Sequence, residues 1–182
     1  MGQSYSAAHE AFMREALRQA QRAADEDEVP VGAVIVHENR IIARAHNQVE
    51  TLHDPTGHAE MIAITQAANF LSCKWLNDCA LYVTIEPCSM CAGALVLARI
   101  KRICFGAGDP KTGACGSVLN IIQHDFLNHK IEVRKGLLGG ECGHLLSQFF
   151  EQKRKSRVSE AGVAQKDLIG TSRNKGTRDL KF

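Results

Sequence analysis

ALYVTIEPCSMC, residues 80–91, joins an apolar segment directly to a pair of cysteines. Residues 80–85 are rich in aliphatic, aromatic and β-branched side chains, which favours a buried strand. Cys88 and Cys91 are three residues apart, so on the first turn of a helix they share one face. The positive end of such a helix favours their thiolate forms. The stretch therefore predicts a strand that delivers two thiolates to the beginning of a helix.

A second motif, His58-Ala59-Glu60, begins 30 residues before Cys88. One imidazole and two thiolates are three zinc ligands, and the fourth position left open is typical of a catalytic zinc site. His58 and Glu60 are about 200° apart around an ideal helix, so both can face one metal only where a helix begins. Thr56-Gly57 before the motif and the apolar run 61–70 after it fit such a beginning.

Each motif alone has other interpretations. Cys-x-x-Cys occurs about as often in structural zinc half-sites and redox pairs as in catalytic sites. His-x-Glu by itself carries almost no information about function. A carboxylate such as Glu60 also stabilises the first turn of many helices without further function. The combination, with each motif opening a helix, predicts a catalytic zinc centre with His58, Cys88 and Cys91 as ligands and Glu60 beside the metal.

Length and composition agree with one enzyme domain. The chain has 182 residues, of which 45% are hydrophobic, and no stretch approaches the roughly 20 apolar residues that span a bilayer. The first residues lack a signal pattern, so we expect a cytoplasmic protein without a membrane partner. Seven cysteines at irregular spacing argue for reduced thiols. The five outside the motif are expected to be small core or surface residues: Cys73, Cys79, Cys104, Cys115 and Cys142.

Positive charge is concentrated at the C-terminal end. Residues 152–182 hold nine Lys or Arg and three Asp or Glu. Residues 158–182 are rich in Gly, Ser, Thr, Lys and Arg, which predicts a basic, disordered tail after a domain of residues 1–157. Both an RNA-attracting arm and a merely solvated tail fit this composition.

The remaining patterns predict alternating helices and strands. A surface helix over 7–24 ends in the acidic loop 25–28, and residues 131–135 form a further short strand before a closing helix. Strand-to-helix crossovers imply a parallel part of the sheet beside an antiparallel hairpin. We therefore expect a three-layer α/β/α domain around one mixed five-stranded sheet. The other expected elements are strands 31–36 and 41–46, the helix after His58, the strand 80–85, the helix from Cys88, the strand 102–106 and the helix 141–155.

The motifs resemble the signature of the zinc-dependent cytidine and adenosine deaminase superfamily. Within it, the chain is most similar to the bacterial tRNA-specific adenosine deaminases, and the resemblance covers roughly residues 7–156. It rests on residues 30–34, 46–47, 84–94, 105–113, 128–129 and 145–150.

The resemblance implies a cytidine-deaminase-like fold and a hydrolytic reaction. One Zn²⁺ per subunit, held by His58, Cys88 and Cys91, would lower the pKa of water toward about 7. Glu60 would take the water proton, deliver it to adenine N1 and later protonate the departing amine. The products are inosine and ammonia, and the expected target is the wobble adenosine in the anticodon loop of an arginine tRNA.

Substrate contacts are also implied by the resemblance. Asn47 would hydrogen-bond the target base, the loop with Asp109 and Lys111 would meet the RNA, and Phe150 would stack on an unpaired base. By themselves these residues fit a turn asparagine, a flexible loop and a core aromatic equally well. Family membership further implies a homodimer, to which residues 91–98 and 51–54 are expected to contribute.

Three alternatives stay open. A free-base or nucleoside deaminase, of the guanine or cytidine type, uses the same zinc and glutamate. A noncatalytic zinc-stabilised binding module would have no use for Glu60. A redox protein built on Cys88 and Cys91 leaves His58 and Glu60 unexplained.

Overall fold

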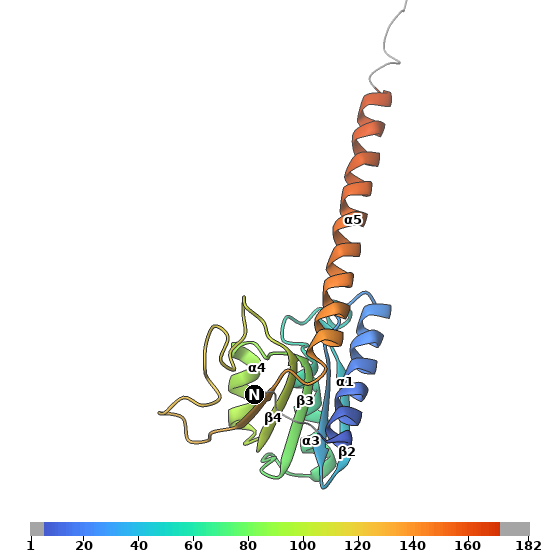
Figure 1. Cartoon of the computed structure of the whole chain (residues 1–182). Coiled ribbons are helices and arrows are strands. Elements are labelled where there is room, and N and C mark those ends of the chain that lie inside the picture. The colour runs from blue at the N-terminus through green and yellow to red at the C-terminus, as the bar shows by residue number, and fades with distance from the viewer. Residues whose placement is uncertain (1–5, 172–182) are drawn as a thin grey trace, which may run out of the picture. The chain divides into compact units, whose positions relative to one another are not determined.

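The structure is a computed structural model that describes the backbone of residues 6–171 and the side chains of residues 6–156. Its five strands form one sheet in the order β2-β1-β3-β4-β5 (Figure 1). β1 pairs antiparallel with β2 and β3, whereas β4 is parallel to both β3 and β5. The predicted mixed five-stranded sheet is therefore confirmed. The strands are β1 (Gly32–His37), β2 (Arg40–His46), β3 (Cys79–Ile85), β4 (Arg102–Ala107) and β5 (Glu132–Lys135).

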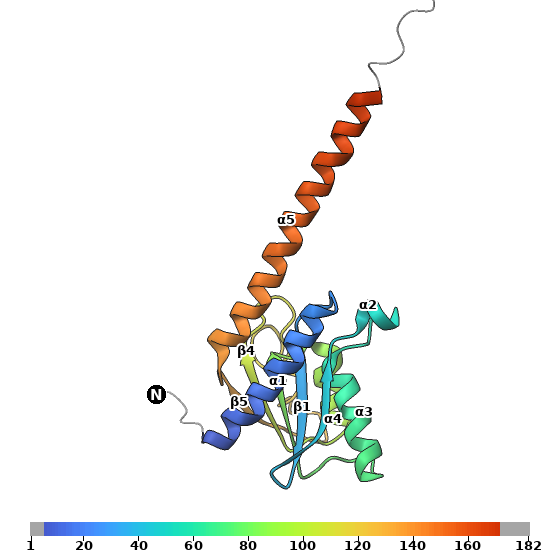
Figure 2. The same cartoon turned by 90° about the vertical axis from the view of Figure 1, so that its right-hand side faces the viewer.

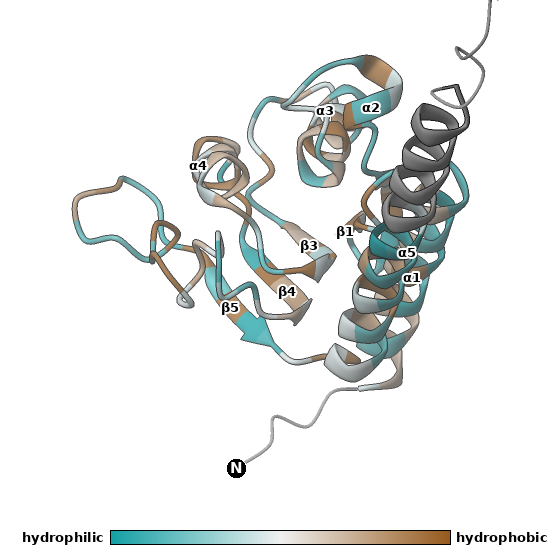
Figure 3. Cartoon of the chain, turned by 90° about the horizontal axis from the view of Figure 1, so that it is seen from above, coloured by the Kyte–Doolittle hydropathy of each residue, from teal (hydrophilic) through white to brown (hydrophobic). Residues whose placement is uncertain are grey.

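Helices cover both faces of the sheet. Figures 2 and 3 show α1 on one face and α3 with α4 on the other, which gives the expected three layers. The helices are α1 (Ala7–Asp25), α2 (Val49–Leu52), α3 (Ala59–Leu71), α4 (Ser89–Leu97) and α5 (Gly139–Thr171). The chain forms two compact units, of which the first ends at Leu146 and the second begins at Ser147. None of the helices described is long and apolar enough to cross a bilayer.

Alternation along the strands supplies two cores. In β1, Ala33 and Ile35 pack with the α3 and α4 side of the sheet, while Val34 and Val36 pack with α1. This period of two is what a strand buried on both faces requires. The sheet is therefore apolar on both sides, and polar side chains that serve a site are confined to the ends of strands and helices.

Two local features fix how α1, β1 and β2 meet. A side chain on Gly32 would overlap the α1 backbone at Ala16 and Ala20, so glycine allows the helix to approach the strand closely. The hairpin between β1 and β2 turns through Glu38 and Asn39, both with positive φ. Two such residues match the twist of the flanking strands. The predicted hairpin is thus closed by a two-residue turn.

The parallel connection from β4 to β5, where no helix or strand was expected, consists of turns and isolated bridges. The structure differs from the sequence-based expectation at two places. The short helix α2 lies where only a loop was expected. α5 continues beyond the expected end at Lys155 to Thr171, because residues 158–168 include good helix formers such as Ala, Gln, Lys and Leu. Residues 172–182 of the proposed tail lie outside the described residues, so the division at residue 157 stays a prediction.

Candidate active site

His58 lies at the N-cap of α3 with extended backbone, φ −75° and ψ 148°. The turn before it is tied by Asp54, whose Oδ1 accepts the Thr56 N–H at 2.8 Å and whose carbonyl accepts the Gly57 N–H at 3.0 Å. Because an N-cap residue stands outside the helical spiral, the angular separation of His58 and Glu60 in a regular helix no longer applies. Both side chains can therefore serve one centre from the beginning of α3.

Cys88 lies at the N-cap of α4, directly after β3, with φ −70° and ψ 175°. Cys91 follows in the first turn of the helix and is fully buried. The local fold agrees with the prediction from residues 80–91: a buried strand ends, and the next helix begins at the first cysteine. Two helix N-termini, those of α3 and α4, thus present the histidine and the cysteines to the same space.

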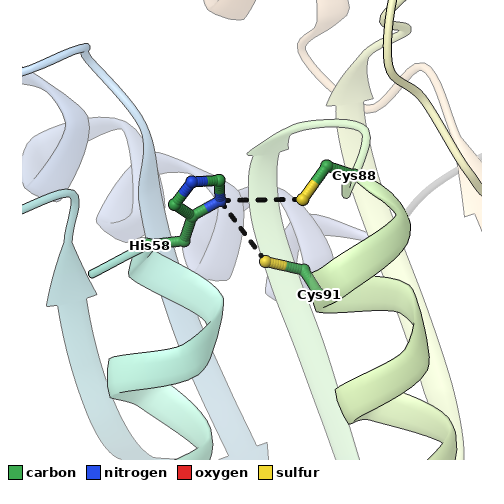
Figure 4. Close-up of side chains that lie close together, drawn as sticks. All are labelled: His58, Cys88 and Cys91. Atoms are coloured by element: carbon green, nitrogen blue, oxygen red, sulfur yellow. Dashed lines mark hydrogen bonds between the residues drawn. The ribbon is translucent and has the colours of Figure 1, made fainter. Parts of the chain in front are cut away.

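The three predicted metal ligands lie close together (Figure 4). Nδ1 of His58 is 3.7 Å from Sγ of Cys88 and 3.5 Å from Sγ of Cys91, and all three donor atoms lie within 4.8 Å of one another. In a tetrahedral zinc site, adjacent nitrogen and sulfur ligands are about 3.6 Å apart, given Zn–N and Zn–S bonds of about 2.05 and 2.3 Å. The donor types and their spacing therefore fit zinc without rearrangement.

The electrostatics of the cluster also suit a metal. Hydrogen bonds from Cys91 and His58 lower the pKa of Cys88 to about 4, so this sulfur is a thiolate at neutral pH. The hydrogen bond between the two cysteines, together with burial, raises the pKa of Cys91. Binding of a cation to such a pair releases the remaining thiol proton.

Glu60 lies in the first turn of α3 and is 3% exposed. Burial raises the pKa of its carboxyl group, and a backbone hydrogen bond, the charge of His58 and a hydrogen bond with Cys91 offset only part of this effect. A carboxyl group with a raised pKa, in contact with a predicted metal ligand, has the properties expected of a general acid and base. The structure thus places Glu60 beside the donor cluster, as the spacing of the motif predicted.

Comparison with known proteins identifies the family. Residues 7–154 match the MafB19-like deaminase family. The chain is 50% identical over 158 residues to the tRNA-specific adenosine deaminase of Aquifex aeolicus, which covers 87% of this chain and 100% of the relative. The chain belongs to the family of tRNA-specific adenosine deaminases.

Solved structures of relatives share the fold of this deaminase. A structure from a study of A-to-I editing by tRNA:A34 deaminases has a TM-score of 0.72 and 42% identity, and the match covers 74% of this chain and 98% of that chain. A guanine deaminase from Bacillus subtilis is also 42% identical, with a TM-score of 0.53 and coverage of 55% of this chain and 64% of that one. The chain is therefore a deaminase, and its relatives include enzymes named for different substrates.

Asn47, the residue expected to meet the base, follows β2 and is 6% exposed. Its N–H donates to the Val31 carbonyl at 3.0 Å, and its side-chain Nδ2 donates to Oε2 of Glu28 at 3.3 Å. The next residue, Gln48, donates its N–H to the carbonyl of Gly57 at 2.9 Å. This bond ties the segment that carries Asn47 to the residue directly before His58.

Glu28, which contacts Asn47, is a buried residue that the sequence analysis did not single out. It belongs to the expected acidic loop 25–28, yet it is fully buried. Its Oε1 accepts the Thr51 N–H at 2.8 Å while its Oε2 faces Asn47. Nothing in the local composition distinguishes Glu28 from Asp25, Glu26 and Asp27, because its role depends on contacts with residues far along the chain.

Glu86 was missed in the same way. It is 2% exposed and accepts the N–H groups of Asp109, Cys115 and Ser117 at 3.1, 2.9 and 3.0 Å, as well as the Ser117 hydroxyl. Burial alone would raise the pKa of Glu86, but these hydrogen bonds outweigh it and lower the pKa. Glu86 thus holds the loop after β4 against the segment that precedes Cys88.

The loop beyond β4 contains two of the predicted RNA contacts. Asp109 turns its carboxylate inward: Oδ1 accepts the N–H groups of Lys111 at 2.8 Å and Thr112 at 3.3 Å, and Oδ2 accepts the Thr112 hydroxyl. Lys111 is exposed. Asp109 therefore shapes the turn that carries the exposed Lys111, and contact of Lys111 with RNA stays a prediction.

Phe150, the remaining predicted substrate contact, belongs to the second compact unit. It is 43% exposed, and its ring packs edge-on against Phe149 with centroids 5.6 Å apart. This arrangement keeps one ring of the pair open to solvent, as stacking on a base requires. The role of Phe150 stays a prediction.

All seven cysteines lie within the described residues and are free thiols. Cys73 is exposed, whereas burial raises the pKa of Cys79 and Cys104 to about 11 and that of Cys142 to about 12. Cys115 is also buried. These thiols match the expected small core and surface residues.

Proposed function

We propose that the chain hydrolyses the wobble adenosine of a tRNA anticodon to inosine and releases ammonia, with one Zn²⁺ per subunit held by His58, Cys88 and Cys91. The observation that carries the proposal is the donor cluster at two helix N-termini with Glu60 buried beside it. Family membership supports adenosine in tRNA as the substrate. By the same resemblance, an arginine tRNA is the expected target.

Bound zinc would supply a Lewis acid that lowers the pKa of water to near neutrality. Glu60 is the proton carrier of the site. It accepts a proton from the attacking water and delivers it to N1 of the base. It then takes the proton of the new C6 hydroxyl group and donates it to the exocyclic nitrogen as the C6–N6 bond breaks, which leaves the C6 carbonyl of inosine and ammonia. Its buried position excludes competing solvent protons, and the raised pKa lets the carboxyl group hold a proton between the two transfers.

Recognition of the RNA would rest on further side chains of both compact units, each considered by itself. Asn47 would contact the edge of the target base, since an amide both donates and accepts. Asp109 fixes the turn that would present Lys111 to the RNA backbone, and Phe150 offers an exposed ring for stacking on a base. The basic residues that follow, including Lys153 and Lys155, suit phosphates.

A homodimer in the cytoplasm completes the proposal. Leu97, on the helix expected at the interface, is 81% exposed although apolar, which favours a covered position in an assembly. Free thiols suit a reducing compartment. Light scattering on the purified protein would give the mass of a dimer.

The alternative is a deaminase of free bases or nucleosides, favoured by the similarity to a guanine deaminase. The test incubates the protein with an anticodon stem-loop that carries adenosine at the wobble position, and in parallel with free adenosine, cytidine and guanine. We expect inosine in the RNA alone, none with Glu60→Ala, and about one zinc per chain by metal analysis. Turnover of a free base or nucleoside in place of the RNA would establish the alternative.

A further inference from the structure

Glu28 reaches the site because of how α1 ends. The Asp27 N–H donates to the Ala24 carbonyl at 3.1 Å and the Glu28 N–H to the Ala23 carbonyl at 2.9 Å, with Asp27 at φ 64°. This is the Schellman pattern of a helix C-terminus, which reverses the chain direction sharply. The reversal turns Glu28 inward, whereas the neighbouring acidic residues Asp25 and Glu26 stay exposed.

The partners of Glu28 are all hydrogen-bond donors. The Thr51 N–H and the Asn47 amide occupy its two oxygens, and the Glu50 N–H and the Thr51 hydroxyl add further donors. Burial alone would raise the pKa of Glu28, but these bonds outweigh it and lower the pKa. An ionised carboxylate accepts hydrogen bonds and donates none.

We propose that Glu28 is a positioning residue that sets which atoms of the Asn47 amide face the substrate; the proposal rests on the function given above. Because the carboxylate only accepts, Asn47 must turn its NH₂ group toward Glu28. The side-chain carbonyl oxygen of Asn47 then points away from Glu28. The edge of the amide that holds this oxygen beside the second N–H points away as well. The backbone bond from Asn47 to Val31 holds the residue in place, so the amide orientation is the remaining freedom that Glu28 removes.

This orientation has a consequence for base choice. An amide that offers its carbonyl oxygen beside an N–H matches the adenine edge, where the N6 amine donates and N7 accepts. Guanine presents acceptors at both O6 and N7, so the same amide edge leaves two acceptors facing each other. Glu28 thereby favours adenine over guanine through a residue that it orients rather than by contact with the base.

The variant Glu28→Gln reverses which residue of the pair 28 and 47 donates the hydrogen bond and which accepts it. A glutamine has a single acceptor oxygen, and the Thr51 backbone N–H cannot rotate away from it. The glutamine oxygen therefore stays with Thr51, its NH₂ group faces Asn47, and the asparagine amide flips to accept. We expect kcat/KM on the stem-loop RNA to fall roughly tenfold or more, since one buried hydrogen bond to the base is lost.

The single variant Asn47→Asp places two carboxylates side by side. We expect its kcat/KM to fall at least as much as that of Glu28→Gln. In the double variant Glu28→Gln with Asn47→Asp, the glutamine donates to the aspartate, and the second aspartate oxygen again offers an acceptor to the N6 amine, although aspartate has no N–H for N7. The double variant is therefore expected to stay below the natural protein but to be at least about tenfold more active than the product of the two single losses predicts. If residues 28 and 47 acted independently, their losses would multiply.

Glu50→Gln is the matched control, because Glu50 is an exposed glutamate beside the same contacts. We expect it to behave as the unchanged protein, and all variants to retain zinc. Multiplying losses in the activity cycle, or a Glu28→Gln protein with unchanged kcat/KM, would overturn the proposal. The unfolding temperature is a second readout that needs no turnover: the double variant should be more stable than Asn47→Asp alone. If the natural chain makes no inosine in RNA, the proposed function fails, and the pairing of residues 28 and 47 is still decided by this stability cycle.

Discussion

Glu60 and Glu86 are buried to nearly the same degree, 3% and 2% exposed, yet their pKa values shift in opposite directions. Glu60 lies in the first turn of α3 with few donors around it, so burial dominates and raises its pKa. Glu86 directly follows β3 and accepts hydrogen bonds from three backbone N–H groups and a hydroxyl, which lower its pKa. Although their solvent exposure is alike, Glu60 is packed more deeply among protein atoms than Glu86, so deeper burial and a smaller number of donors together separate the two carboxyl groups.

This difference suits two kinds of work. A group that passes protons needs comparable free energies for its two protonation states, which a shortage of donors provides. A group that holds a loop needs to stay ionised, which a full set of donors provides. Glu28 belongs with Glu86, since neutral donors alone occupy both of its oxygens.

The strongest test of the contrast is Glu60→Gln. Glutamine keeps the shape of the side chain but cannot exchange protons, so we expect kcat to fall by roughly 10³-fold. Because burial already disfavours the charge of Glu60, the unfolding temperature is not expected to fall. Inosine formation and differential scanning fluorimetry on the same sample check both outcomes. A variant that kept a tenth of the activity would remove Glu60 from the proton path.

Glu86→Gln should act mainly on stability. One of the carboxylate oxygens is replaced by an NH₂ group that faces backbone N–H groups, and we expect the free energy of unfolding to fall by roughly 3 kcal/mol. Urea denaturation measures the loss. Glu141→Gln, at an exposed glutamate paired with Arg14, is the control and should change stability by less than about 0.5 kcal/mol. Equal effects of the two variants would contradict an anchoring role for Glu86.

The response to acid tests the sign of the Glu28 shift. Its pKa in the folded protein lies below the ordinary glutamate value of about 4.3, so its stabilising contribution is present above that pH and is lost as the pH falls through the folded pKa. Glu28→Gln should therefore cost more stability at pH 7 than at about pH 3.5. Urea denaturation at both pH values gives the difference, and a constant cost would mean that the pKa of Glu28 is not lowered.

Ser117→Ala is expected to have the smallest effect. It removes the hydroxyl donor to Glu86 but leaves the three backbone donors. The free energy of unfolding should fall by about 1 kcal/mol, with inosine formation nearly unchanged. A loss as large as that of Glu86→Gln would show that the hydroxyl, rather than the backbone groups, holds the loop.

The sheet and the donor cluster could be predicted because their signals are local. Alternation in residues 33–36 assigns each side chain to one face, and the spacing of Cys88 and Cys91 fixes a helix turn. A motif at a helix N-terminus can be recognised from its own residues, without knowing how the rest of the chain folds. The geometry of His58 relative to both sulfurs then follows from two adjacent helix beginnings.

The supporting carboxylates could not be predicted for the opposite reason. A glutamate in a polar loop is ordinarily a surface residue. Glu28 and Glu86 are buried only because backbone N–H groups 23 to 31 residues further along the chain turn toward them. The connection from β4 to β5 illustrates the same limit, since its course is set by bonds to Glu86 rather than by periodicity.

Cys73 gives the molecule a chemical handle. It is the exposed cysteine among seven, all of which lie in the described residues, and it follows the C-terminal end of α3. The opposite end of that 13-residue helix carries His58 and Glu60, about 20 Å away along the axis. A fluorophore attached through this thiol would thus report on RNA arriving at the other end of α3. The buried thiols stay unlabelled, and bound zinc would protect Cys88, which is only partly buried.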